Sequence, residues 1–212
     1  MRKPPQSTLE PRKSPSQARS AASVDAVLKA TIQVLLKVGK ENLTTTRVAA
    51  RAGVSVGTLY QYFPNKSALL RAVLRRHLEE VGAVLETACR EQAGASPETM
   101  ATALVTSFLN AKMKDVRASV ALYSVSSDVD GAQIVREMSQ KANRAIAAML
   151  ASATDGLTSD PELVASMLRA TMAGVSRRLL ESASPELEFE RVRDELVILV
   201  CAYLRARPKR ST

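Results

Sequence analysis

The sequence predicts an all-α fold of about nine helices. Apolar residues make up 46% of the 212 residues but aromatic residues only 3%, so the core must be aliphatic. Ala, Leu, Val and Met dominate that apolar fraction, and this composition favours helices over sheets. Apolar residues also recur at spacings of three and four along most of the chain. An all-β or parallel α/β fold is therefore not expected.

Helix start and stop signals divide the chain into elements. Residues 1–20 combine four prolines and five cations with few apolar residues, which predicts a disordered basic arm. Gly39 and Gly53 are predicted to end helices, and Asn65 to cap a long one. Ser96-Pro97-Glu98 is a start signal, repeated at 160–161 and 184–186. The predicted helices cover about 24–39, 44–52, 55–62, 66–91, 97–112, 116–124, 132–153, 161–182 and 185–206.

The positive charge is concentrated at the N-terminal end. Residues 1–66 hold eleven of the 30 basic residues and three of the 21 acidic ones, so this third carries +8 of the net charge of +9. A basic head on a nearly neutral remainder indicates a partner that is a polyanion. Nucleic acid is the first candidate for that partner, and an anionic membrane surface is the second.

Several classes of protein are not expected. Cys89 and Cys201 lie far apart and outside any Cys/His cluster, so neither a disulfide framework nor a metal site is predicted, and no cofactor motif is present. The longest apolar run, 196–204, is far shorter than the roughly 20 residues of a membrane helix. The prolines of the arm replace the apolar stretch of a secretory signal. A cytoplasmic protein without membrane contact is the expectation.

The stretch from Thr44 to Lys66, TTTRVAARAGVSVGTLYQYFPNK, has helix-turn-helix spacing. Two short helices are joined by a turn at Gly53, which can adopt a left-handed conformation. Val48 and Leu59 are placed to pack between the two helices. Spacing of this kind is typical of DNA-binding units, but it also occurs elsewhere.

The residue identities in this stretch are more specific than their spacing. AGVSVGTLYQYFPNKSALL, following TTTR, resembles the N-terminal DNA-binding domain of TetR family transcriptional regulators, over about residues 22–72. The resemblance implies a three-helix head, a long fourth helix, and a helical body for ligand binding and dimerisation. The domains it implies are a basic arm (1–20), a helix-turn-helix domain (21–66), an effector-binding and dimerisation domain (67–206) and a basic tail (207–212).

The resemblance also implies which side chains face DNA. The recognition helix is Ser55 to Tyr62, and the expected DNA-binding residues are Thr45, Thr46, Arg47, Ser55, Val56, Gly57, Thr58, Tyr60, Gln61, Tyr62 and Lys66. Many members carry Lys where this chain has Val56, so guanine readout is not expected there. Val56 can instead contact a thymine methyl, and Gln61 can address adenine. Tyr62 and Leu59 are alternatively core residues, Arg51 is expected to be solvated, and the arm either contacts DNA or has no role.

The sequence of the helical body, residues 67–206, supports two further predictions. Residues 161–182 and 185–206 have apolar faces broad enough to pack on the body and on a second subunit, and the alternative is burial within a monomer. The expected dimerisation residues are Val164, Leu168, Met172, Gly174, Val175, Leu196, Val200 and Tyr203. Pliable or aromatic residues suited to an apolar effector are Phe108, Met113, Tyr123, Ile134, Met138 and Met149, each of which can equally be core. The single histidine, His77, is expected to be an exposed helix residue.

These observations predict a dimeric regulator that binds double-stranded DNA at a palindromic operator. In the family such regulators are usually repressors, released by a small-molecule effector that changes the spacing of the two heads. The alternative is an architectural DNA-binding protein that acts without an effector or with a protein partner. An enzyme is not expected, because one histidine and no nucleophile, phosphate-loop or metal motif leave no catalytic set.

Overall fold

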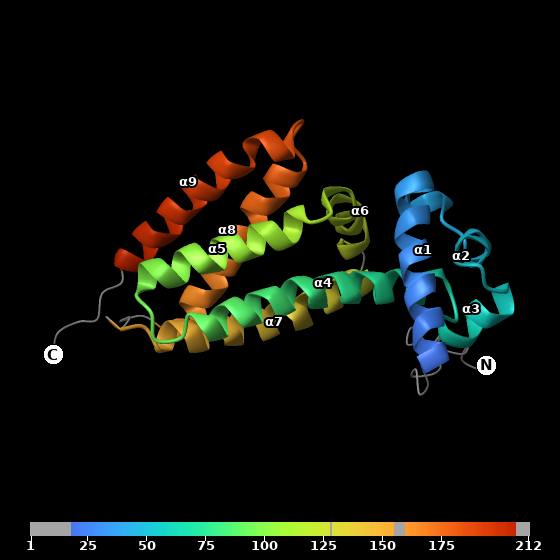
Figure 1. Cartoon of the computed structure of the whole chain (residues 1–212), viewed down its shortest axis with the longest axis horizontal. Coiled ribbons are helices and arrows are strands. Elements are labelled where there is room, and N and C mark those ends of the chain that lie inside the picture. Colours follow the sequence, from blue (N-terminus) through green and yellow to red (C-terminus); the bar gives the residue numbers. More distant parts are fainter. Residues whose placement is uncertain (1–17, 128, 155–159, 207–212) are drawn as a thin grey trace, which may run out of the picture. The chain divides into compact units, whose positions relative to one another are not determined.

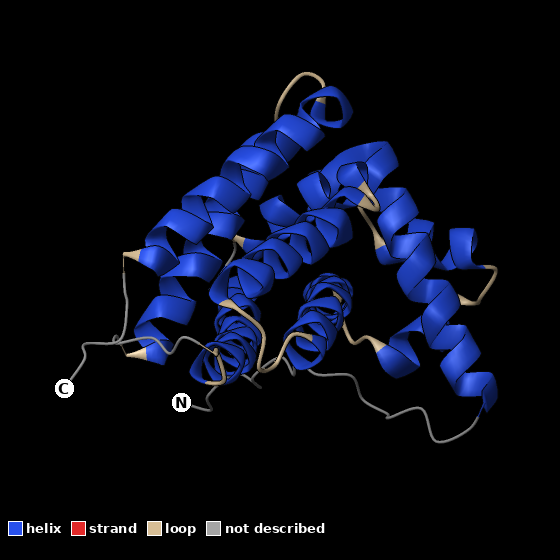
Figure 2. Ribbon diagram, turned by 60° about the vertical axis from the view of Figure 1, so that its left-hand side comes forward, coloured by secondary structure: helices blue, strands red, loops and turns tan. Residues whose placement is uncertain are grey.

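The computed structural model describes residues 18–127, 129–154 and 160–206, and these residues form helices and no strand (Figure 2). The all-α prediction with about nine helices is confirmed. The helices are α1 (Ala18–Asn42), α2 (Thr45–Ala52), α3 (Val56–Tyr62), α4 (Lys66–Glu91), α5 (Pro97–Met113), α6 (Val116–Ser126), α7 (Val129–Ala151), α8 (Pro161–Leu180) and α9 (Pro185–Arg205).

Both ends of α1 differ from the prediction, and ends of α6, α7 and α8 differ from it by two or three residues. The helix begins at Ala18, so the last residues of the predicted disordered arm are helical. Three alanines within the first five residues of α1 supply the helix propensity that the proline-rich stretch before them lacks. The helix also continues past Gly39 to Asn42, with a local break at Gly39, where φ is 75°. Residues 1–17 of the arm and the tail 207–212 lie outside the described residues.

The chain divides into two compact units, and the boundary falls inside α4. The first unit comprises the residues up to Arg76 together with Ala121–Ile134, and the second comprises His77–Val120 and the residues from Val135 on. The first unit therefore contains the first three helices and the corner between α6 and α7. The second contains α5, α8 and α9.

The first unit is built on α1, which packs against α2, while α2 packs against α3 (Figure 1). Val48 of α2 and Leu59 of α3 are fully buried, as their spacing predicted, and Phe63 closes the core after α3. Arg76 donates to Asp25 of α1 at 2.5 Å. Hydrogen bonds from Lys29 and Arg76 hold the pKa of the Asp25 carboxyl below its usual value. This ion pair joins the start of α1 to α4 within the unit.

The corner between α6 and α7 belongs to the same unit. Gly131, in the first turn of α7, lies so close to the end of α6 that a side chain there would collide with the backbone of Val125 and Ser126. Lys40 near the end of α1 donates to the Ser124 carbonyl at 3.4 Å. A glycine is thus required at position 131 for the two helices to meet.

The second unit has an aliphatic core to which α5, α8 and α9 all contribute. These three helices pack on one another in pairs, and Figure 1 shows α9 and α8 beside α5. The core is lined by Leu, Val, Ala and Met, with Phe108 the one aromatic side chain buried in the cluster. Burial of such side chains contributes about 1.5–3 kcal/mol each and is the main stabilising term of the unit.

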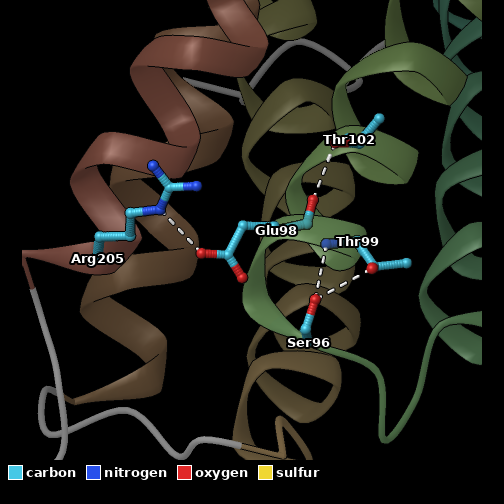
Figure 3. Close-up of polar contacts among 5 residues, drawn as sticks. All are labelled: Ser96, Glu98, Thr99, Thr102 and Arg205. Carbon is cyan, nitrogen blue, oxygen red and sulfur yellow. Dashed lines mark hydrogen bonds and ion pairs between the residues drawn. The ribbon is translucent and has the colours of Figure 1, made fainter.

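An ion pair fixes the end of α9 to the start of α5 (Figure 3). The Ser96 hydroxyl accepts from the Thr99 backbone N–H, and this caps α5 as predicted. Arg205 donates through Nε to the Glu98 carboxylate at 2.9 Å. That hydrogen bond is the largest cause of the lowered pKa of Glu98. The α5 and α9 helices are thereby held in register at one end of the unit.

Among the described residues, no helix is long and apolar enough to cross a membrane. Cys89 is buried and Cys201 half-buried, and both are free thiols. Burial raises the pKa of the Cys89 thiol to about 11, so this group is an unreactive core residue at neutral pH.

Candidate nucleic-acid interface

The turn between α2 and α3 is closed by a glycine, as the spacing predicted. Gly53 has φ 69° and ψ 28°, and its backbone N–H donates back to the end of α2. A residue with a Cβ is strained in this left-handed conformation. Val54 then donates to the Ala49 carbonyl at 3.1 Å. These bonds fix the angle at which α3 leaves α2.

Short-range caps fix the first turns of both helices. The Thr44 hydroxyl accepts from the Arg47 backbone N–H at 3.2 Å, and Ser55 accepts from the Thr58 N–H at 2.9 Å. The hydroxyls of Ser55 and Thr58 also bond to each other. Ser55 and Thr58 are therefore occupied in capping α3, and a contact with DNA would have to share these hydroxyls.

Four of the predicted DNA-binding residues are held in place by hydrogen bonds within the unit. The hydroxyls of Thr45 and Tyr60 are 3.0 Å apart, which joins the start of α2 to α3. Arg47 donates through Nη1 to the Asn42 carbonyl at 2.6 Å, and Lys66 donates to the Glu41 carbonyl at 3.1 Å. Neither carbonyl neutralises a cation, so both charges stay available to an anion.

The remaining predicted residues differ in exposure. Thr46, Val56, Gly57 and Gln61 are exposed and make no hydrogen bond through their side chains among the described residues. Tyr62 is half-buried. The α2–α3 face, which we define as Thr45–Arg47, Ser55–Gln61 and Lys66, thus combines an exposed apolar side chain, an exposed amide, several hydroxyls and two cations.

The sequence of α2 and α3 contains no acidic residue, so nothing on either helix offsets Arg47 and Arg51. The N-terminus of α4 follows α3, and there the Asn65 side chain accepts from the Ala68 N–H. A face with cations, hydroxyls and helix N-termini and without carboxylates attracts a polyanion.

The backbone acceptors at the end of α1 were missed by sequence reasoning. The carbonyls of Glu41 and Asn42 position Lys66 and Arg47, but a backbone carbonyl leaves no trace in residue type. The pairing of Asp25 with Arg76 was also missed, because it spans 51 residues of sequence. Such partners follow only from the three-dimensional fold.

The predicted effector residues fall into different units. Phe108 and Met149 belong to the core cluster of the second unit, where Met113 and Met138 are half-buried. Tyr123 and Ile134 belong to the first unit, where Ile134 is buried. Their role as an effector site remains a prediction.

His77 is not the exposed residue that was expected. It is half-buried, and its Nε2 is shielded from solvent and has no hydrogen-bond partner in the part of the chain that the structure describes. Burial, together with the positive charge of Lys112, lowers the pKa of His77 to about 4. The periodicity of α4 explains the error, since His77 follows buried Val73 and precedes buried Val81 by one turn each.

Lys112 of α5 is a second buried charged group that the sequence did not reveal. Its side chain is only 7% exposed. Burial lowers the pKa of the Lys112 ammonium to about 8. It lies one helical turn after buried Phe108, on the face of α5 that packs into the unit.

The predicted dimerisation residues lie mostly inside their own chain. Buried side chains in this set are those of Val164, Leu168, Met172, Leu196 and Val200. Tyr203 and Val175 are partly buried against the same core, and Gly174 is exposed. The apolar side chains that α8 and α9 leave exposed are different ones: Leu163, Met167, Leu187, Ile198 and Leu199.

Two clefts open on the same helices. One, of about 430 Å³, is lined by Val175, Arg178, Arg191, Val192, Glu195, Leu196, Ile198 and Leu199. The other, of about 520 Å³, is lined by Gly174, Arg177, Arg178, Glu181 and Ser182. They share Arg178, and a side chain at Gly174 would meet open space. We refer to these clefts and the exposed side chains as the α8–α9 face.

The fold and the capped α2–turn–α3 unit define a helix-turn-helix protein. Residues 27–73 match the family model for bacterial regulatory proteins, tetR family, and residues 96–204, half of the chain, match the model for the tetracyclin repressor-like C-terminal domain. The chain belongs to the TetR family of bacterial regulatory proteins. The resemblance stated from the sequence is thus confirmed.

Individual relatives support the same assignment. The HTH-type transcriptional repressor KstR of Mycolicibacterium smegmatis is 42% identical over 71 residues, which cover 34% of this chain and 34% of KstR. The match therefore spans about a third of that relative's length. Two solved structures share the fold: Salmonella enterica GusR (TM-score 0.71, 18% identity, 91% of this chain and 100% of that one) and Bacillus subtilis FadR in complex with stearoyl-CoA (TM-score 0.69, 16% identity, 84% and 97%).

Proposed function

We propose that this chain is a transcriptional regulator of the repressor kind, which binds a palindromic operator as a homodimer and is released by a small-molecule effector. The single observation that carries the proposal is the α2–α3 face within a matched TetR head. In this proposal residues 21–66 are the DNA-binding domain and 67–206 serve effector binding and dimerisation. A protein that acts on chromosomal DNA works in the cytoplasm.

Side-chain chemistry assigns some residues of the α2–α3 face to phosphates and others to base edges. Arg47, Tyr60 and Lys66 are anchored donors, and anchored donors suit phosphates, which set the register on the duplex. Val56 and Gln61 are exposed and unanchored, and they are the residues that we assign to base edges. An apolar Val56 fits a thymine methyl, and the Gln61 amide fits adenine.

The α8–α9 face supports the homodimer. Ile198 is 62% exposed and Leu199 is 50% exposed, and they line the same cleft as Val175 of α8. Contiguous apolar surface beside a cleft marks an interaction site, and a two-fold axis lets the same patch cover itself. A dimer also sets two recognition helices about 34–36 Å apart or a multiple of that, as successive half-sites require.

The proposed effector is mainly apolar. FadR of Bacillus subtilis was solved with stearoyl-CoA, a ligand with a long apolar tail. Phe108 and Met149 in the body of this chain are of the kind that pack on such a tail, which supports a mainly apolar effector. The effector acts only through a difference in its affinity for the two conformations of the dimer.

Selection of DNA from a random pool by the purified full chain tests the proposal. We expect an enriched inverted repeat that binds at least a thousandfold more tightly than scrambled DNA at the same salt concentration. Equal binding of both DNAs with a steep salt dependence would reject sequence-specific regulation. It would favour instead the alternative of an architectural DNA-binding protein.

A further inference from the structure

A cleft of about 330 Å³ lies in the first unit, between α1 and α2. It is lined by Gln33, Val34 and Lys37 of α1 and by Arg51 of α2. None of these residues belongs to the α2–α3 face to which DNA binding is assigned above. Gln33 and Lys37 are one helical turn apart and so share a face of α1. The cleft thus brings two cationic side chains together from two helices.

Arg51 is exposed, as expected, and a hydrogen bond orients its guanidinium at this cleft. Its Nε donates to the Gln33 side-chain carbonyl at 2.6 Å. This bond leaves the two Nη groups as a fork, and the fork is the geometry that binds two oxygens of one anion. A neutral amide fixes the guanidinium without neutralising it.

The charges in the cleft are not compensated. Neither Lys37 nor Arg51 forms an ion pair among the described residues. Other cations of α1 differ: Lys29 pairs with Asp25 at 2.8 Å, and Lys40 donates to the Ser124 carbonyl. Two like charges that share one cleft repel each other, and a bound anion removes that repulsion.

We infer that this cleft binds a phosphate group. The Arg51 fork holds two of its oxygens, the Lys37 ammonium holds a third, and Gln33 is a positioning residue. A carboxylate offers only two oxygens in one plane, so three donors that line one cleft from two helices fit a tetrahedral phosphate better. The phosphate comes either from a free phosphorylated molecule or from a DNA backbone outside the operator contacts.

Titration of the full chain with inorganic phosphate tests the site without any DNA, so the result is independent of the proposed function. The readout is the chemical shift of the Arg51 side-chain Nε–H and of backbone amides in α1 and α2. We expect saturable binding that weakens about tenfold in Arg51→Gln and in Lys37→Gln, since each substitution removes charge-assisted hydrogen bonds. Gln33→Leu keeps the charge and is expected to weaken binding several-fold by releasing the fork.

The matched control is Arg144→Gln. Arg144 is an exposed arginine of α7 in the second unit, and the substitution removes the same charge. It is expected to bind phosphate as the unmodified chain does. No saturable binding, or equal affinity in Arg51→Gln and the unmodified chain, overturns the site, and so does equal weakening in Arg144→Gln. Helix content and thermal unfolding of each variant show that the fold is intact.

The two phosphate sources are separated with the selected operator. If the phosphate belongs to DNA, Arg51→Gln lowers the slope of log affinity against log salt by about 0.9 per lost contact. An unchanged slope in a variant that has lost phosphate binding assigns the cleft to a free phosphorylated molecule. Only this last step rests on the proposed function.

Discussion

The two exposed faces of this chain are built in opposite ways. On the α2–α3 face of the first unit, hydroxyls and cations are tied to neighbours by hydrogen bonds such as that between Thr45 and Tyr60. On the α8–α9 face of the second unit, large apolar side chains, among them Ile198 at 62% exposure, line a cleft together with charged groups. The first face presents directed donors, and the second presents apolar surface.

The difference teaches what each face can recognise. Directed donors select a partner by the position of its acceptors, which suits phosphates and base edges. Apolar surface has no direction and selects a partner by shape and by exclusion of water, which suits another copy of the same face. Sequence-specific regulation needs both, because the dimer multiplies the affinity of two weakly bound heads.

The largest expected effect comes from placing a charge in the α8–α9 face. Leu199→Glu buries a carboxylate in the proposed interface, which should weaken dimerisation at least a hundredfold and lower operator affinity by about the same factor. Analytical ultracentrifugation and operator titration measure the two effects. The control is Val84→Glu, which alters an exposed valine of α4 in the same unit. A Leu199→Glu protein that stays dimeric would remove this face from the assembly.

The two faces also differ in how much of them the sequence predicted. The turn at Gly53 involves partners three or four residues away, so residue type and spacing were sufficient. Residues Leu196 and Val200 were correctly predicted to be apolar helix positions, but their burial inside the chain depends on how α9 packs on α5 and α8. Which side of a broad apolar helix stays exposed is a property of the packing.

The next largest effect is a pH dependence of stability that arises from a buried ring in the second unit. His77 is the single histidine of the chain, and its pKa in the fold is about 4 against a usual value of 6.5. Below pH 6.5 the unfolded chain takes up a proton that the folded chain does not, so stability falls with pH until about pH 4. Between pH 7 and pH 5 the free energy of unfolding should drop by about 2 kcal/mol from this group alone.

Denaturant unfolding at several pH values compares the unmodified chain with His77→Gln. The variant should lose most of the dependence between pH 6.5 and pH 5, while the carboxylates keep their effect at lower pH in both proteins. Identical profiles in the two proteins would show that the buried ring does not govern this window. Operator binding at pH 7.5 should be unaffected, because His77 lies outside the α2–α3 face.

The smallest effects separate changes in stability from changes in DNA contact within the α2–turn–α3 unit. Gly53 has a positive φ and free space around it, so Gly53→Ala should cost about 1 kcal/mol of stability through backbone strain alone.

Gly57 lies in α3, and a Cβ there would make an ordinary 3.7 Å contact with the Ser55 hydroxyl. Gly57→Ala should therefore raise stability by about 0.5–1 kcal/mol through helix propensity. Because Gly57 is exposed on the proposed recognition helix, the added methyl should nonetheless weaken operator binding about tenfold. Thermal unfolding and operator titration of both variants measure these effects. Gly53→Ala should lower stability, whereas Gly57→Ala should raise stability and weaken operator binding. Full operator affinity in Gly57→Ala would show that α3 does not approach DNA at this residue.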